Sequence, residues 1–179
     1  LENIRAAMAQ DIYIAKGGEE TIFPRFTYHG YRFVEITGID EPLPAASVKG
    51  VVLSSIHELV SRYETSDEKV NKLWENITWS SFANFMSIPT DCPQRNERLG
   101  WAGDISVFSR TATYLADVPQ FLRRYLRSMR DVQREDGRFP DIAPLGGGFG
   151  GLLWGSAGIT VPWECYLQYG DKVLLAMTP

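Results

Sequence analysis

The sequence has little cysteine or histidine, which limits the metal and redox chemistry it can support. Cys92 and Cys165 are the only cysteines in 179 residues, and His29 and His57 are the only histidines. A closed zinc site needs four such ligands, usually in close sequence pairs, and these four show no pairing. We therefore expect no metal and no cofactor. Two unlinked, packed thiols are favoured over a Cys92–Cys165 disulfide, because free cysteine is commonly buried.

Clusters of basic residues and long apolar runs are also missing. The 18 Lys and Arg face 22 Asp and Glu, for a net charge of −4, and the cations form no block or stripe. Nucleic acid is bound through a basic surface that neutralises phosphates, so we do not expect it as a partner. No apolar run approaches the roughly 20 residues that span a bilayer, which argues against a membrane role.

The two ends of the chain have the character of cuts. The sequence opens at Leu1 without an initiator methionine or a signal-peptide core, and it stops at Pro179 just after the expected start of a helix. We therefore expect a piece of a longer protein, with room for one ordinary domain or for parts of two.

The first third of the sequence has the patterning of β-strands. Asp11–Ala15 and Glu20–Thr27 are strand-like runs separated by a Lys-Gly-Gly turn signal. Phe26–Ile36 alternates around a His-Gly turn, which predicts a hairpin or a bulged bend. Ser47–Ser54 predicts a further strand. We assign residues 1–60 to the end of a β-sandwich domain and its linker.

From Ser66 onward the apolar period is helical, and residues 61–179 are assigned to the first part of a helical domain. Ser66 is expected to cap a helix that Ile88-Pro89 ends. Later helices are expected to start at Gly103, Val118 and Asp171, and one to end at Tyr169, with Gly170 after it and Pro162 causing a kink or a late start. The first three helices have apolar faces at the 3/4 spacing: Val70, Leu73, Trp74, Ile77, Ser81 and Phe85; Ile105, Phe108, Ala112 and Leu115; and Phe121, Leu122, Tyr125, Leu126, Met129 and Val132.

The loop between the first two helices carries most of the reactive side chains. Residues 91–104 read Asp-Cys-Pro-Gln-Arg-Asn-Glu-Arg-Leu-Gly-Trp-Ala-Gly-Asp. Three carboxylates in one cleft repel one another, which raises the pKa of at least one and keeps it protonated near neutral pH. Acceptors for hydroxyls, a Trp101 face for stacking on a sugar ring and a proton donor together suit a carbohydrate site.

Structural alternatives stand beside this interpretation. Asp104, after a glycine, is also a good helix N-cap. Arg95 and Arg98 could form ordinary ion pairs with Glu97, and Trp101 could belong to the core.

Two further features invite a chemical interpretation. Cys92 as a nucleophile would need a nearby base, and neither histidine is close in the sequence. The glycine-rich run Gly146–Gly151 lacks the Gly-Lys-Ser/Thr ending of a phosphate loop, so nucleotide binding is not expected. A loop that brings Trp154 to a cleft and a buried Trp154 fit the pattern equally well.

Residues 91–104 resemble the signature of the α-L-rhamnosidases of glycoside hydrolase family 78, Asp-Cys-Pro-Gln-Arg-(Asp/Asn)-Glu-Arg-Leu-Gly-Trp-(Thr/Ala)-Gly-Asp, at every position when Asn96 is allowed. Phe26–Glu35 resembles the segment that closes the family's preceding β-domain, and residues 154–171 resemble a later helix. The likeness covers nearly the whole chain. It implies a mainly α protein: a partial (α/α)6 catalytic barrel, preceded by the last strands of a β-sandwich, that hydrolyses terminal α-L-rhamnosides with inversion.

The resemblance also implies roles for individual residues. Glu97 would be the general acid that protonates the departing glycosidic oxygen. The sugar hydroxyls would be bound by Asp91, Arg95 and Asp104. An apolar wall near the sugar's methyl group would be formed by Trp101 and Trp154. Asn96 replaces a charge next to the acid, and Ser156 stands where the family often has Asp.

Inversion needs a second carboxylate about 6.5–9.5 Å across from the acid to activate water. Nothing from Asp171 to Pro179 resembles the base of this family, so we expect the chain alone to be inactive. The alternatives are a non-catalytic carbohydrate-binding relative and a purely structural helical region. Apolar helix faces left without a neighbour would favour a homo-oligomer, aggregation or a loosened core.

Overall fold

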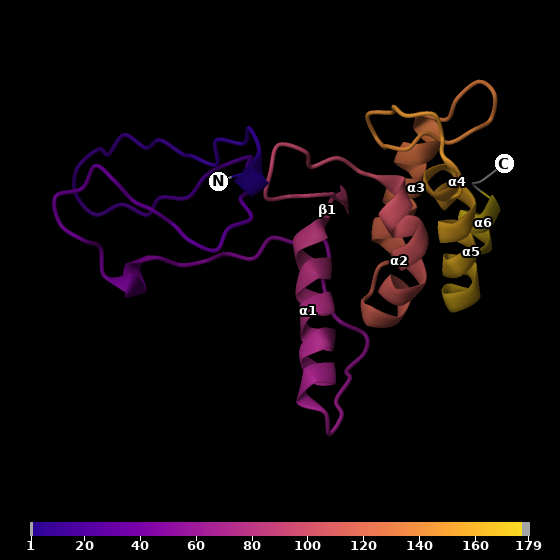
Figure 1. Cartoon of the computed structure of the whole chain (residues 1–179), viewed down its shortest axis with the longest axis horizontal. Coiled ribbons are helices and arrows are strands. Elements are labelled where there is room, and N and C mark those ends of the chain that lie inside the picture. Colours follow the sequence, from indigo (N-terminus) through magenta and orange to yellow (C-terminus); the bar gives the residue numbers. More distant parts are fainter. Residues whose placement is uncertain (1, 177–179) are drawn as a thin grey trace.

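Regular structure is concentrated after residue 67 of the computed structural model, which describes residues 2–176. Before that point lie two short 3-10 helices, η1 (Glu2–Ile4) and η2 (Ala45–Ser47). The later elements are, in chain order, α1 (Glu68–Asn84), β1 (Phe85–Met86), β2 (Ile88–Pro89), α2 (Ala102–Leu115), α3 (Pro119–Asp131), α4 (Leu152–Gly155), α5 (Ala157–Tyr169) and α6 (Lys172–Ala176). In Figure 1 the N-terminal segment forms long loops on one side, α1 stands in the middle, and α2 to α6 gather on the other side.

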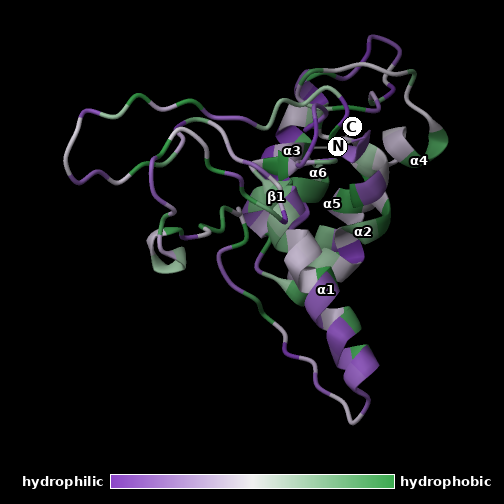
Figure 2. Ribbon diagram, turned by 60° about the vertical axis from the view of Figure 1, so that its left-hand side comes forward, coloured by the Kyte–Doolittle hydropathy of each residue, from purple (hydrophilic) through white to green (hydrophobic). Residues whose placement is uncertain are grey.

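The strands predicted within residues 1–60 are wrong for this structure. Between residues 2 and 60 the described backbone forms no strand, and its one bridge pairs Leu59 with Ala116. A strand is stable only where a neighbouring strand takes up its backbone hydrogen bonds, and none of these runs has such a neighbour. Their apolar side chains therefore remain in solvent, as at Ile14 and Phe33, and Figure 2 shows hydrophobic and hydrophilic stretches alternating along these loops.

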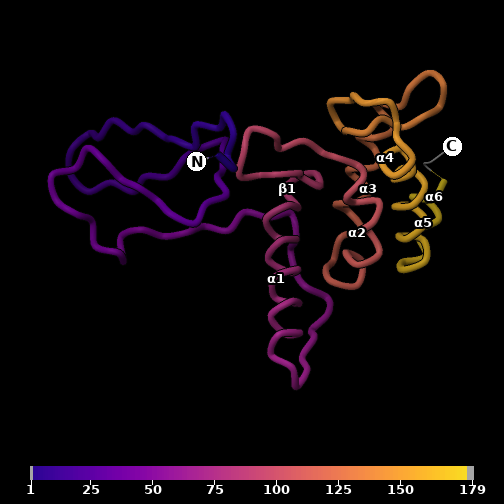
Figure 3. Tube along the Cα trace, in the orientation of Figure 1, coloured from indigo at the N-terminus to yellow at the C-terminus, as the bar shows by residue number. Residues whose placement is uncertain are grey.

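The core lies between α2, α3, α5 and α6, which stand side by side in Figure 3. The faces predicted for the second and third helices are confirmed, with Phe108 and Val132 half-buried and the rest buried. α5 and α6 add Ala157, Val161, Cys165 and Leu174. Full burial of one large apolar side chain contributes about 1.5–3 kcal/mol, so this cluster is the main source of stability.

α1 packs on the core from its second turn onward, with Trp74 and Ile77 half-buried against the core cluster. Ser81 and Phe85 are buried, and the Phe85 ring stacks on Phe121 with 4.5 Å between centroids. Val70 and Leu73 are exposed, so the buried face predicted for this helix is wrong at these two positions.

The ends of α1 also differ from the prediction. Its N-cap is Asp67 rather than Ser66, because the Asp67 carboxylate accepts a 2.8 Å hydrogen bond from Lys69 N. The helix ends at Asn84, earlier than predicted, because the chain turns at Ser87 (φ 66°) and pairs β1 with β2.

The C-terminal helices follow the prediction more closely. α5 ends at Tyr169, and Gly170 has the expected left-handed conformation, with φ 66°. Of the two alternatives predicted from Pro162, a kink or a late start, the late start is wrong, since α5 begins at Ala157 with Pro162 inside it. α6 begins at Lys172, one residue after the predicted start. Among the described residues, no helix combines the length and apolarity that a bilayer crossing requires.

Candidate carbohydrate site

The loop between β2 and α2 is held at both of its ends by backbone hydrogen bonds. Asp91 N donates to Leu99 O at 2.8 Å, which closes the loop on itself. Ala143 N donates to Gly100 O at 3.0 Å, and Tyr125 donates its hydroxyl to the same carbonyl at 2.9 Å. A Cβ at Gly100 would collide with Ala143 O, so the close approach of these two segments requires glycine.

A cavity of about 540 Å³ opens beside this loop. It brings together four residues that the sequence singled out, Asp91, Trp101, Asp104 and Trp154. They come from the site loop, the first turn of α2 and the short helix α4. The rest of the lining is largely apolar and includes Ile77, Phe85, Phe108 and Leu153. An apolar pocket with a few convergent polar groups is the usual form of a small-molecule site.

Trp154 reaches the cavity because glycine occupies position 103. A Cβ on Gly103 would lie only 2.8 Å from Nε1 and Cε2 of the Trp154 indole, so the ring rests directly on the backbone of α2. Trp154 is 37% exposed, which decides against the alternative of a buried tryptophan. Trp101 is half-buried, and its buried Nε1 has no partner among the described residues.

Asp104 is not the N-cap of α2. The helix begins two residues earlier, at Ala102, and its capping residue Trp101 makes no side-chain cap hydrogen bond. Instead Ala102 N donates to Asp141 O at 2.9 Å, so backbone from a later loop covers the helix start. Asp104 lies in the first turn, exposed, with its carboxylate free of hydrogen-bond partners among residues 2–176.

Two arginines contact Glu97 through the same carboxylate oxygen. Arg95 contacts Glu97 Oε2 through Nε at 2.9 Å and Nη2 at 2.8 Å, and Arg5 Nη1 lies 3.3 Å from the same oxygen. The ion pair considered for Arg95 is therefore present, whereas Arg98 makes none with Glu97. Glu97 Oε1 has no partner in the described part of the chain. Glu97 does not line the cavity, but one of its oxygens lies within 4.8 Å of an oxygen of Asp91, which does.

Asp91, Cys92 and Glu97 each present one possible metal-ligand atom, all within 4.8 Å of one another. Cys92 donates its thiol to Asp91 Oδ1 at 2.9 Å. Partial burial and this hydrogen bond raise the pKa of Cys92 to about 11. Because electrophiles react with the thiolate, a neutral Cys92 does not suit a nucleophile near pH 7. Both cysteines are free thiols, and Cys165 is buried.

Asp141 is a residue that the sequence interpretation missed. Its buried carboxylate accepts hydrogen bonds from Gly151 N at 2.8 Å and Phe149 N at 3.2 Å. Gly151 is the N-cap of α4, the helix that carries Trp154. The only sequence signal is its place between two prolines upstream of the glycine run, which does not reveal burial.

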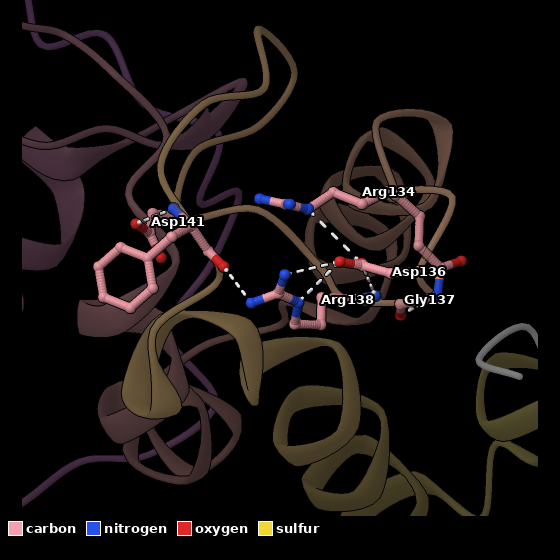
Figure 4. Close-up of polar contacts among 7 residues, drawn as sticks. Arg134, Asp136, Gly137, Arg138 and Asp141 are labelled. Atoms are coloured by element: carbon pink, nitrogen blue, oxygen red, sulfur yellow. Dashed lines mark hydrogen bonds and ion pairs between the residues drawn. The ribbon is translucent and has the colours of Figure 1, made fainter.

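An ionic network fixes the other side of the glycine-rich loop (Figure 4). Arg138 pairs with Asp136 at 2.6 Å and donates to Phe149 O at 3.2 Å. Arg134 lies 3.5 Å from Asp136. The backbone of Phe149 is therefore hydrogen-bonded on both sides, with its N–H donating to Asp141 and its carbonyl accepting from Arg138.

Comparison with known proteins gives matches across both parts of the chain. Residues 58–178 match the bacterial alpha-L-rhamnosidase 6 hairpin glycosidase domain, and residues 1–54 match the bacterial alpha-L-rhamnosidase concanavalin-like domain. An alpha-L-rhamnosidase of Streptomyces avermitilis is 49% identical over 97% of this chain, and one of an Alteromonas species is 41% identical over 97%. The chain spans 17% and 20% of the length of these two relatives.

A solved structure gives the same result. The crystal structure of a Streptomyces avermitilis alpha-L-rhamnosidase complexed with L-rhamnose superposes with a TM-score of 0.91 and 48% identity. The superposition covers 97% of this chain and 17% of that one. With a domain model matching most of its length, the chain belongs to the bacterial alpha-L-rhamnosidase family.

Proposed function

We propose that this chain supplies the acid side of the active site of an inverting glycoside hydrolase that removes terminal α-L-rhamnosyl residues. The observation that carries the proposal is the cavity in which Asp91, Asp104, Trp101 and Trp154 meet, with the Glu97 carboxyl beside Asp91. A relative with 48% identity over this region has been crystallised with L-rhamnose.

Glu97 is the proposed general acid. Its Oε2 is engaged by Arg95 and Arg5, whereas its Oε1 is free to carry a proton toward a leaving oxygen. A carboxyl anchored through one oxygen keeps the other in a defined direction, which proton transfer over about 2.6–3.2 Å requires.

Asp91, Arg95 and Asp104 are the proposed ligands of the sugar hydroxyls. The carboxylates accept hydroxyl protons, and the guanidinium donates to hydroxyl oxygens, each as a charge-assisted hydrogen bond. Trp101 and Trp154 form the proposed apolar wall for the sugar's methyl group, since both indoles line the cavity.

Hydrolysis with inversion also needs a base on the far face of the sugar. None of the residues from Asp171 to Pro179 resembles that base. We therefore expect the 179-residue chain to bind rhamnose without hydrolysing it.

The domain assignment belongs to the same proposal. We assign residues 61–179 to part of an (α/α)6 barrel, which the match to a 6 hairpin glycosidase domain supports. We assign residues 1–60 to a β-sandwich and its linker, supported by the match of residues 1–54 to a concanavalin-like domain. The exposed face of α1, with Leu73 at 57%, supports a homo-oligomer through helix faces when the chain is alone.

Calorimetric titration of L-rhamnose into the chain tests binding. L-Mannose is the matched control, because it differs only by a hydroxyl on the carbon that should face the tryptophans. We expect tighter binding of rhamnose and little change in its affinity in Glu97→Gln. Equal affinity for both sugars, or none for rhamnose, contradicts the proposed pocket.

Turnover is tested in a chimaera in which these residues replace the matching segment of the Streptomyces avermitilis relative. Glu97→Gln should lower turnover of alkyl rhamnosides by about 10²–10⁴-fold, and that of aryl rhamnosides less, because a good leaving group needs less protonation. Normal turnover of an alkyl rhamnoside by Glu97→Gln contradicts the assignment. Binding without turnover in the unsubstituted chimaera would favour the non-catalytic carbohydrate-binding alternative.

A further inference from the structure

The loop that carries the proposed acid has an unfavourable backbone. Cys92 and Arg98 both have positive φ, 53° and 55°, in the left-handed region that residues with a Cβ rarely adopt. Such conformations persist only where surrounding contacts determine them. Asp91 and Leu99 pair at the base of the loop, so the contacts that fix its outer part must come from elsewhere.

Arg98 supplies these contacts. Its Nε donates to Pro93 O at 3.1 Å, across the loop. Its Nη2 donates to Tyr28 O at 2.7 Å, and its guanidinium carbon lies 4.7 Å from the centre of the Tyr28 ring. One partly buried side chain thus joins both sides of the loop to a segment 70 residues earlier.

The N-terminal segment approaches the loop at two more points. A Cβ on Gly30 would lie 2.8 Å from the Gln94 Cβ, so the backbone passes closer to the loop than another residue would allow. Arg5 lies 3.3 Å from Glu97. Figure 3 shows the N-terminal end returning to the loop that follows β1, although its long loops extend away from the helices.

We propose that Arg98 is a positioning residue, which holds residues 91–99 in their strained conformation by clamping them to the backbone and ring of Tyr28. This rests on the proposed function, because the residues held are the proposed acid Glu97 and the proposed sugar ligands Asp91 and Arg95. Arg98 itself does not line the cavity. The N-terminal segment thereby contributes to sugar binding without contacting the sugar.

Two measurements on the 179-residue chain test this, hydrogen exchange of residues 91–99 and calorimetric affinity for L-rhamnose. Arg98→Ala should speed exchange in the loop and weaken rhamnose binding about tenfold or more, since small displacements of binding groups are costly. Tyr28→Ala should change both in the same direction. Tyr28→Phe should leave exchange and affinity at the wild-type values, because Arg98 hydrogen-bonds to the backbone carbonyl of residue 28 and the ring is kept. Arg62→Ala removes an exposed arginine whose one ionic partner among residues 2–176 is Glu64, and it should match the wild type.

The outcomes separate the two proposals. Unchanged exchange in a folded Arg98→Ala chain overturns the clamp. Faster exchange with unchanged affinity overturns its positioning role. If Arg98→Ala loses helical circular dichroism, Arg98→Lys, which keeps the charge but not the planar fork, and Tyr28→Ala decide by the same criteria. A wild-type chain that does not bind rhamnose overturns the proposed function, and the exchange data then still decide whether Arg98 holds the loop.

Discussion

Residues 2–55 and residues 68–176 contain apolar side chains in regular patterns, yet only the second region buries them. Ile14 is 86% exposed, whereas Ile105 in α2 is 1% exposed. A helix satisfies its backbone hydrogen bonds internally, so it can form wherever one face finds a neighbour. A strand needs a second strand before it forms at all. An apolar pattern therefore predicts burial only when the neighbouring helix face or second strand that it requires is present.

The sharpest test of this comparison is truncation of one large apolar residue in each region. Leu122→Ala removes a fully buried side chain of α3 and should cost about 2–5 kcal/mol of unfolding free energy. Phe26→Ala removes a fully exposed ring and should stay within about 0.5 kcal/mol of wild type. Urea unfolding followed by circular dichroism measures both. A large loss in Phe26→Ala would show that the N-terminal segment has a buried side in solution.

Residues 132–151 do not fit this contrast between the two regions, because they lack helices and strands yet include the buried Asp141. Asp141→Ala should cost about 1–3 kcal/mol for the buried Gly151 N–H left without an acceptor, and less for the part-buried N–H of Phe149. It should also change the fluorescence of Trp154, identified by subtracting spectra from a Trp154→Phe background. Asp136→Ala, on the exposed side of the same loop, is the control. Equal effects of the two substitutions would contradict a special role for the buried carboxylate.

The site lies in the helical region, and its polar groups should matter for binding more than for stability. Asp91→Asn and Asp104→Asn should each weaken L-rhamnose binding by about 1–3 kcal/mol, through loss of a charge-assisted hydrogen bond. Neither should shift the unfolding midpoint much, because Asp104 does not cap α2. Titration calorimetry and thermal unfolding on the same samples check this. A silent Asp104→Asn would remove Asp104 from the proposed sugar ligands.

The smallest expected effect is a loosening of the glycine-rich loop at low pH. Arg138 lowers the pKa of Asp136 from 3.8 to about 2 through their hydrogen bonds. Because the folded-state pKa is depressed, this contribution is present above about pH 4 and is lost as the pH falls through about 2. Asp136 is exposed, so solvent screens the pair and the effect should be slight. Proteolysis of the glycine-rich loop should be faster in Asp136→Asn than in wild type at pH 6. The difference should shrink when both are assayed at pH 2 with an acid protease.

Much of the helical region follows from the sequence alone. The α3 stripe from Phe121 to Met129 repeats at the helical period and is buried as expected. Gly170 ends α5 in the left-handed conformation that glycine tolerates. Three of the six predicted site residues, Asp91, Trp101 and Asp104, line one cavity because the signature loop and the start of α2 are contiguous in the chain. These features depend on local backbone preferences, which a single sequence records.

Long-range contacts decided the rest. Whether Asp104 caps α2 depended on Ala102 donating to Asp141 O, 39 positions away. Whether Trp154 faces the cavity depended on Gly103, and the role of Arg98 depended on the Tyr28 carbonyl. The sequence by itself determined which residues are candidates for the sugar site and which segments become helical, because both are properties of residue type and local spacing. Only the tertiary structure decided that the Asp141 carboxylate is buried and engaged by the backbone of Phe149 and Gly151, because partners 8 and 10 positions away in the chain leave no periodic signal.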